Sequence, residues 1–376
     1  MNLLETTMTD LAAPFTPDWV SPPGDTLLDI LDERDWTQDE LAQRLGYTPK
    51  HVNQLIKGKV PLTEDAAIRL ERVVGSTVGF WLAREAKYRE RCARLAAAEK
   101  FAGWINWLDT LPLKEMMSAG AIEKCRIDAK TKPGLVEACL RFFGIASPDE
   151  WQGRYGQMQA AFRRSREEQS DVGAISAWLR MGEQVAEKQD GVKFNRSKFI
   201  AALDEIRTYT TLPPEEFEPL LRTAFSSAGV AFVLVPAIPK AHVSGVARWL
   251  NPHRPLIQLS LYGKTNDKFW FTLFHEAAHV LLHGKEKESV YLDDPNKSGA
   301  DSIQEREAND WAGDFLIPPR YKSQLPGLRT KAAVCEFAAA IGIHPGIVVG
   351  RLQHDGLIEP SWMNDLRESF RLIAAK

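Results

Sequence analysis

Residues 269–282, with the sequence FWFTLFHEAAHVLL, constrain this chain more than any other segment. The segment is apolar on nearly all sides, which is typical of a helix buried in a core, yet it contains His275, Glu276 and His279. Residues four apart lie on one helix face, about 5–6 Å apart at Cβ, so both imidazoles can reach one metal ion. Catalytic zinc takes three protein ligands and a water. Glu276 projects about 100° further round the helix, towards such a water.

This spacing predicts a metal-dependent hydrolytic site in which His275 and His279 are ligands and Glu276 is the general base. Ionisable groups in a buried helix must be paired or bound to metal, because burying them unsatisfied costs several kcal/mol. The alternative interpretation is a pair of core histidines that hydrogen-bond to the backbone.

A third metal ligand is expected from the helical pattern that follows this segment. Glu305 shares one face of that pattern with Ala308 and Ala312. Small alanines let the two helices approach closely, so Glu305 is predicted to reach the metal. Glu307 lies on another face and is the second choice.

Two further residues are predicted to support the ligands from outside. Asn309 follows Glu305 by one turn and can hold neighbouring groups. His283 is two turns from His275, about 12 Å by helical rise, so the three histidines of this helix cannot bind one ion. His283 is therefore expected to support the ligands or to end the helix.

Three strand-like runs precede the metal helix, and a turn over residues 251–255 joins the last two. They are Val230–Val235, Gly245–Leu250 and Leu256–Leu261. A hairpin that feeds into such a helix is the layout of zinc proteases, where a substrate backbone lies along a sheet edge. The sequence leaves open which strand forms that edge. His242, Tyr262 and Tyr291 are the candidates for stabilising an oxyanion.

Residues 26–74 contain four short helical patterns with explicit caps. Thr37 to Glu40 forms a capping box, and Gly46 breaks the helix that follows. Thr48 then caps the next helix, with Pro49 at its first position. Two helices joined by a tight turn with a glycine form a helix-turn-helix.

The second helix of this unit offers an exposed polar face. Its predicted DNA contacts are Thr48, Lys50, His51, Asn53, Gln54 and Lys57. Asn and Gln can read adenine edges, and Lys contacts guanine or phosphate. Residues 41–63 contain basic but no acidic side chains, which indicates a local positive patch. The alternative is a small helical bundle with a solvated face.

The N-terminal segment contains further motifs: Trp36-Thr37-Gln38, the stretch from Gly46 to Gly58, Pro61-Leu62 with Ala66, and Phe80-Trp81-Leu82. In these motifs, over about residues 20–92, the chain resembles the Xre-type antitoxins of the HigA group. The resemblance implies a homodimer on a palindromic double-stranded DNA operator, commonly the protein's own promoter, with half-sites about one helical turn apart. It also implies a toxin as a protein partner.

The HEAAH segment, the stretch from Glu305 to Ala312 and Leu316-Ile317-Pro318 together resemble the ImmA/IrrE metallopeptidases, over about residues 195–355. The resemblance implies a small α+β zincin domain that cleaves helix-turn-helix repressors. It also implies one catalytic Zn²⁺, with Mn²⁺ as the other candidate, held by His275, His279 and Glu305, and Glu276 as the base. The chain has Tyr262 where this subgroup often has arginine, so a substrate contact by that arginine is not carried over.

The composition indicates a soluble globular protein: 376 residues, 44% of them hydrophobic, with a formal charge of −3. The four cysteines have no CxxC spacing and are typical of reduced cytosolic thiols. The N-terminus lacks the pattern of a signal peptide, and no apolar run reaches the ~18 residues of a membrane span. We therefore expect a cytoplasmic protein with no membrane partner.

The predicted fold class is mainly α and multidomain: an all-α helix-turn-helix domain, a helical middle region and an α+β zincin-like metallopeptidase domain. The predicted division is a flexible leader (1–25), the helix-turn-helix domain with a connecting helix (26–99), the middle region (100–210), the peptidase domain (211–320) and a C-terminal helical region (321–376).

The C-terminal region repeats the helix-turn-helix pattern without gaps. Residues 40–52 align with residues 336–348, but Gly346, Ile347, Val349 and Gly350 replace the polar outer face. This copy is not expected to read bases. It is interpreted as an element that packs against the peptidase domain or a dimer partner, and the alternative is coincidental similarity of two helix turns.

Two functions remain open at this point. The first is a DNA-tethered zinc endopeptidase that regulates transcription by cutting a regulatory protein, such as a helix-turn-helix repressor. The second is a HigA-like antitoxin and autorepressor that binds its operator and a toxin, with a non-catalytic zincin domain for recognition. An intact Glu276 favours the first, because a structural metal needs no base beside it.

Overall fold

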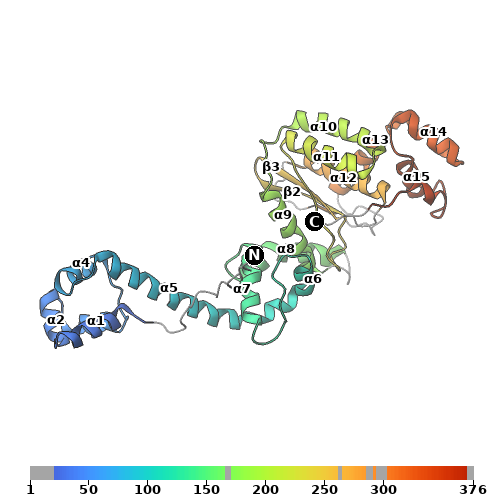
Figure 1. Ribbon diagram of the computed structural model, residues 1–376. Coiled ribbons are helices and arrows are strands. Elements are labelled where there is room, and N and C mark those ends of the chain that lie inside the picture. Colours follow the sequence, from blue (N-terminus) through green and yellow to red (C-terminus); the bar gives the residue numbers. More distant parts are fainter. Residues whose placement is uncertain (1–20, 166–170, 261–264, 285–290, 294–302, 371–376) are drawn as a thin grey trace, which may run out of the picture. The chain divides into compact units, whose positions relative to one another are not determined.

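The computed structural model describes residues 21–165, 171–260, 265–284, 291–293 and 303–370, with side chains excepted at 157–165 and 291–293. The chain forms two compact units, residues 1–103 and 104–376 (Figure 1). Most of the described elements are helices, and there is one small sheet. The predicted mainly α, multidomain class is confirmed. The five-part division stays a prediction.

The described part of the N-terminal unit, residues 21–103, forms five helices. They are α1 (Pro23–Glu33), α2 (Gln38–Leu45), α3 (Pro49–Ile56), α4 (Glu64–Val73) and α5 (Val78–Gly103). The side chains of Thr37, Thr48 and Thr63 each accept a hydrogen bond from the backbone N–H three residues on, which explains where three of the helices begin. Helix α1 begins inside the predicted leader, of which residues 1–20 lie outside the described part.

Trp81 anchors α5 to this bundle. Its side chain is completely buried among the leucines of α1 to α4. Its indole Nε1 donates to the backbone oxygen of Gly75, 3.0 Å away. The indole therefore fills the core while its polar atom is satisfied.

The C-terminal unit contains the remaining elements. Before the sheet come η1 (Ile105–Thr110), α6 (Leu113–Ser118), α7 (Lys132–Phe143), α8 (Pro148–Ser165), α9 (Val172–Glu187), α10 (Arg196–Thr208), η2 (Tyr209–Thr211) and α11 (Pro214–Ala228). The strands are β1 (Ala231–Leu234), β2 (Gly245–Asn251), β3 (Arg254–Leu259) and β4 (Tyr291–Asp293). The other helices are α12 (Asn266–Leu282), α13 (Ile303–Leu316), η3 (Pro319–Gly327), α14 (Lys331–Ile341), α15 (Pro345–His354) and η4 (Asn364–Leu366).

The sheet has the strand order β1-β3-β2-β4. Strands β2 and β3 form the predicted antiparallel hairpin, and β1 pairs with β3 in parallel. All three predicted runs are therefore strands. Strand β4, which pairs antiparallel with β2 and forms one edge of the sheet, was not predicted from the sequence.

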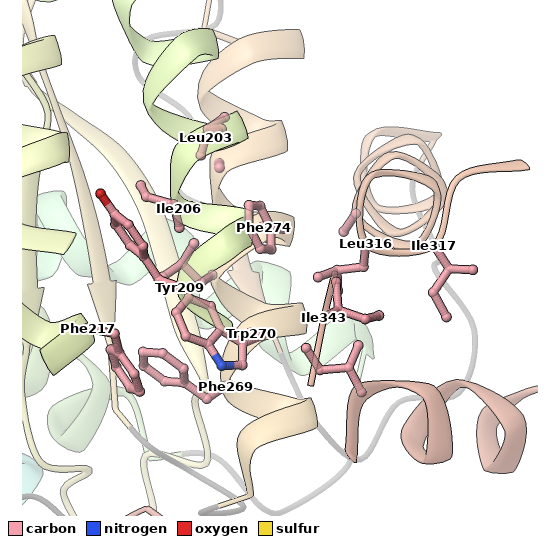
Figure 2. Packing of buried hydrophobic residues seen from close by; sticks show 14 of the residues in the cluster. Leu203, Ile206, Tyr209, Phe217, Phe269, Trp270, Phe274, Leu316, Ile317 and Ile343 are labelled. Atoms are coloured by element: carbon pink, nitrogen blue, oxygen red, sulfur yellow. The ribbon is translucent and has the colours of Figure 1, made fainter. Parts of the chain in front are cut away.

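Helices cover both faces of the sheet (Figure 1). On one face, Gln258 and Arg248 donate to the backbone oxygens of Trp178 and Leu179 in α9. On the other face, Ile257 joins a hydrophobic core with α10, α11 and α12. Figure 2 shows side chains of α10, α12 and the end of α13 in this core. The sheet thus supports the helix that carries the HExxH motif.

Helices α14 and α15 have the helix-turn-helix geometry that the internal repeat predicts. They meet at 113°, and Gly342 lies at φ 68° between them, as Gly46 does at φ 71° between α2 and α3. Helix α15 packs on α12, where a Cβ at Gly346 would lie 2.5 Å from Oδ1 of Asn266. The pair therefore packs against the helix that carries the HExxH motif, which is one of the two predicted roles.

Among the described helices, none is by itself long and apolar enough to cross a membrane. Helices α14 and α15 together reach that composition, but their apolar side chains lie in the core of the C-terminal unit.

Candidate metal centre and nucleic-acid interface

The HExxH segment lies in the middle of α12, which packs on β2 and β3. His275, Glu276 and His279 are 2% exposed or less. The backbone N–H of Asn266, at the start of the helix, donates to the backbone oxygen of Glu368. This helix is thus held at its N-terminus by the chain's C-terminal segment and along its length by the sheet.

Two imidazoles and one carboxylate converge beside this helix. The Nε2 atom of His275 lies 3.0 Å from Nε2 of His279 and 3.2 Å from Oε2 of Glu305, and Oε1 of Glu305 lies 3.5 Å from Nε2 of His279. Ligands at 2.0–2.1 Å from a tetrahedral zinc stand about 3.3 Å apart. Both the spacing and the donor types therefore fit a zinc ion.

The charge states also favour metal binding. Burial lowers the pKa of His279, and the neighbouring His275 adds to this effect, although Glu305 opposes it. Burial disfavours ionisation of Glu305, but its hydrogen bonds with the two histidines outweigh this and hold its pKa at about 2. At neutral pH the site thus offers neutral imidazole and ionised carboxylate, the forms that bind metal.

Glu276 lies on the side of α12 that faces β2. Its side chain is fully buried, and a Cβ at Gly245 would lie 2.7 Å from its Oε1. The absence of a side chain at Gly245 therefore creates the space in which the Glu276 carboxylate lies. This role of Gly245 was not predicted from the sequence.

Helix α3 in the N-terminal unit presents the predicted polar face. Thr48, Lys50 and Lys57 are exposed, and His51, Asn53 and Gln54 are half-buried. The amide nitrogen of Asn53 donates to Oε1 of Gln38 in α2, and the ring of His51 packs edge-on against Tyr47. The Thr48 side chain caps the helix, so three of the six predicted contacts already have partners in the fold.

The positive charge of this face comes mainly from its lysines. Arg44, at the end of α2, pairs with Glu40 at 2.8 Å and lies over the ring of Trp36. Its charge is therefore partly neutralised. Lys50, Lys57 and Lys59 are exposed and remain available to phosphate groups.

Comparison with known protein families gives two matches. Residues 27–81 match the helix-turn-helix family, and residues 233–352 match the peptidase M78 family, described as the IrrE N-terminal-like domain. The chain combines an Xre-type helix-turn-helix domain with an M78 domain. The predicted combination of the two domain families is confirmed.

A curated relative matches over a short part of the chain. The uncharacterized HTH-type transcriptional regulator YddM of Escherichia coli (strain K12) is 37% identical over 60 residues. The match covers 16% of this chain and 64% of YddM. The chain is thus similar to an HTH-type transcriptional regulator over less than a fifth of its own length.

The predicted residues of helix α13 have different surroundings in the M78 domain. Glu305 lies with the two histidines, whereas Glu307, the second choice, pairs through Oε2 with Nε2 of His283 at 2.9 Å. Ala308 and Ala312 are fully buried in the contact between α12 and α13, as the pattern predicts. Asn309 is half-buried one turn after Glu305, and its supporting role stays a prediction.

The three oxyanion candidates also stay predictions. His242 has a left-handed backbone conformation, with φ 47°, shortly before β2 of the M78 domain. Tyr262 lies outside the described residues. Tyr291 lies in the edge strand β4, of which only the backbone is described.

Proposed function

We propose that this protein is a DNA-binding transcriptional regulator whose M78 domain is a metal-dependent endopeptidase that cuts a regulatory protein, in the first place a helix-turn-helix repressor. The observation that carries the proposal is the convergence of His275, His279 and Glu305, whose potential ligand atoms all lie within 4.8 Å of one another. Glu276 is buried beside them. A metal that only stabilised the fold would not need this carboxylate.

His275, His279 and Glu305 would hold the ion, which is Zn²⁺ by donor type, or Mn²⁺. When bound, such an ion polarises a peptide carbonyl and makes water more acidic. Glu276 would accept the proton of the attacking water and return it to the leaving amine. His275, Glu276 and His279 are buried, and their low-dielectric surroundings would strengthen the effect of each of these charges.

The edge strand β4 gives a peptide a place to lie. It pairs on one side with β2, whose first residue Gly245 touches the Glu276 side chain. Among the described strands, β4 has a neighbour only on the β2 side, and a substrate that adds to its other side would extend the same sheet. Its backbone would then run past the metal ligands.

The N-terminal domain would bring the protein to its operator. The polar face of α3 would enter the major groove of double-stranded DNA, with Gln54 and Asn53 reading bases and the lysines contacting phosphates. A homodimer would present two such helices to the halves of a palindrome. All four cysteines are free, which agrees with a cytoplasmic site of action.

The Glu276→Gln variant tests the proposal. Because the amide keeps the size of the side chain but cannot accept the proton, the variant should retain DNA binding and bind metal as the wild type does, and it should lose cleavage. Pull-down with this variant should capture the uncut substrate, which wild-type protein then cleaves in vitro. Lys87→Gln, an exposed change on α5, is the control.

A second function competes with this one: a HigA-like antitoxin and autorepressor that binds its operator and a toxin, with a non-catalytic M78 domain. The likeness to a transcriptional regulator favours it as far as DNA binding is concerned. Full complementation in cells by Glu276→Gln would favour this second function. So would a captured partner that wild-type protein leaves intact.

A further inference from the structure

His283 lies at the end of α12, one turn after His279, and only 8% of it is exposed. Its Nδ1 is 3.1 Å from Nδ1 of His279, and its Nε2 is 2.9 Å from Oε2 of Glu307 on α13. One imidazole thus bridges a proposed metal ligand and an acidic residue on the neighbouring helix. We call His279, His283 and Glu307 the His–His–Glu chain.

The direction of the hydrogen bonds in this chain follows from the ligand geometry. His279 faces His275 and Glu305 through Nε2, so Nε2 is the nitrogen that would hold a metal. A neutral imidazole that binds through Nε2 carries its proton on Nδ1. This N–H donates to Nδ1 of His283, which must therefore accept.

The same reasoning fixes the outer bond. When Nδ1 of His283 accepts, its proton lies on Nε2 and is donated to Glu307. A carboxylate only accepts hydrogen bonds, so the bonds of the chain run in one direction, from the metal ligand to Glu307. Any other tautomer of His279 would break either the ligation or the bond to His283.

We propose that His283 and Glu307 are positioning residues that fix the tautomer and ring orientation of His279. The inference rests on the metal centre proposed above. Histidine ligands generally donate their second N–H to a carboxylate or carbonyl, and loss of that partner lowers metal affinity or activity 10–100-fold. Here an imidazole is inserted between the ligand and the carboxylate. Glu307, whose side chain is 56% exposed, thereby orients the buried ligand His279 through its hydrogen bond with His283.

Cobalt(II) binding tests the inference without any need for a substrate. Affinity is measured by competition with a chelator, and the visible absorption of bound Co²⁺ reports the ligand geometry. Glu307→Ala should weaken binding by roughly 10–100-fold and change the absorption. Glu307→Gln, whose amide oxygen still accepts the bond from His283, should restore most of the affinity and the spectrum.

Asp310→Ala is the matched control, since it removes a negative charge from the exposed face of the same helix. It should change neither readout. His283→Ala should lose at least as much affinity as Glu307→Ala, and adding Glu307→Ala to it should cost little more, because both act through one chain.

Wild-type affinity and spectrum in Glu307→Ala would overturn the inference, and so would an equal loss in Asp310→Ala, because the effect would then be one of net charge. A wild-type protein that does not bind Co²⁺ would overturn both the assignment of the metal ligands and the proposed role of the His–His–Glu chain. A protein that binds Co²⁺ as expected but cleaves no partner would refute the proposed peptidase activity and leave the inference intact.

Discussion

The contact between Gly245 and Glu276 makes the position of the proposed base testable. In Gly245→Ala the new Cβ would stand 2.7 Å from Oε1 of Glu276 and 2.7 Å from Cγ2 of Thr272. Ordinary contacts begin near 3.5 Å, so the carboxylate must move by roughly 0.8 Å. The backbone of Gly245 is not in the left-handed region, so alanine is otherwise permitted there.

A misplacement of this size costs on the order of 100-fold in rate, about 2.7 kcal/mol of activation free energy. The assay is the initial rate of cleavage of the protein captured by Glu276→Gln. Metal affinity is measured beside it and should stay at the wild-type value, because the atoms nearest the added Cβ belong to Glu276 and Thr272 rather than to a metal ligand. Gly134→Ala, where an added Cβ meets no atom within 4 Å, is the matched control.

Two results would refute this reasoning. A Gly245→Ala protein that cleaves as fast as the wild type would mean that the approach of β2 does not position Glu276. A parallel loss of metal affinity would mean that the substitution disturbs the whole site rather than the base alone.

Two further predictions concern DNA recognition and stability. Gln54→Ala should cost about 1–3 kcal/mol of binding to an operator from the protein's own promoter and less on random DNA; equal losses in fluorescence anisotropy on both would remove Gln54 from base readout. Glu183→Gln should lower the free energy of unfolding by about 3–5 kcal/mol in urea titrations, because it leaves the buried Arg248 without a counter-charge, whereas the more exposed Glu187→Gln should cost under about 1 kcal/mol. Burial opposes the ionisation of Glu183, but the arginines outweigh it and hold its pKa below the ordinary value of 4.5. The stabilisation by Glu183 is therefore present above pH 4.5 and is lost as the pH falls below that value. A stability difference between Glu183→Gln and wild type that stays constant down to pH 3 would contradict this prediction.

The sequence predicted those parts of the metal site that depend on helical periodicity. His275 and His279 are four residues apart, and the faces of α13 place Glu305 with Ala308 and Ala312. These relations are local, so the spacing of the residues along one helix was sufficient to predict which side chains lie together. The hairpin of β2 and β3 was predictable for the same reason, because its turn lies between its strands.

The parts that were missed depend on contacts between distant segments. Gly245 matters only because β2 passes beside Glu276, and β4 is a strand only because its three residues pair with β2. Gln258 and Trp178, whose contact fixes α9 on the sheet, are 80 residues apart in the sequence. No pattern within a window of one element carries such information.

The two helix-turn-helix elements explain how one backbone pattern can serve two purposes. In the first, polar side chains at positions such as Lys50 and Gln54 keep the outer face of α3 in solvent. In the second, glycine occupies the equivalent positions, and a Cβ at Gly350 would lie 2.6 Å from Oδ2 of Asp267 on α12. The glycines therefore let α15 approach the start of the metal helix as closely as backbone permits. The skeleton of buried residues determines the fold of both elements, whereas the residues of the outer face determine whether the second helix can meet DNA or must pack against the peptidase domain.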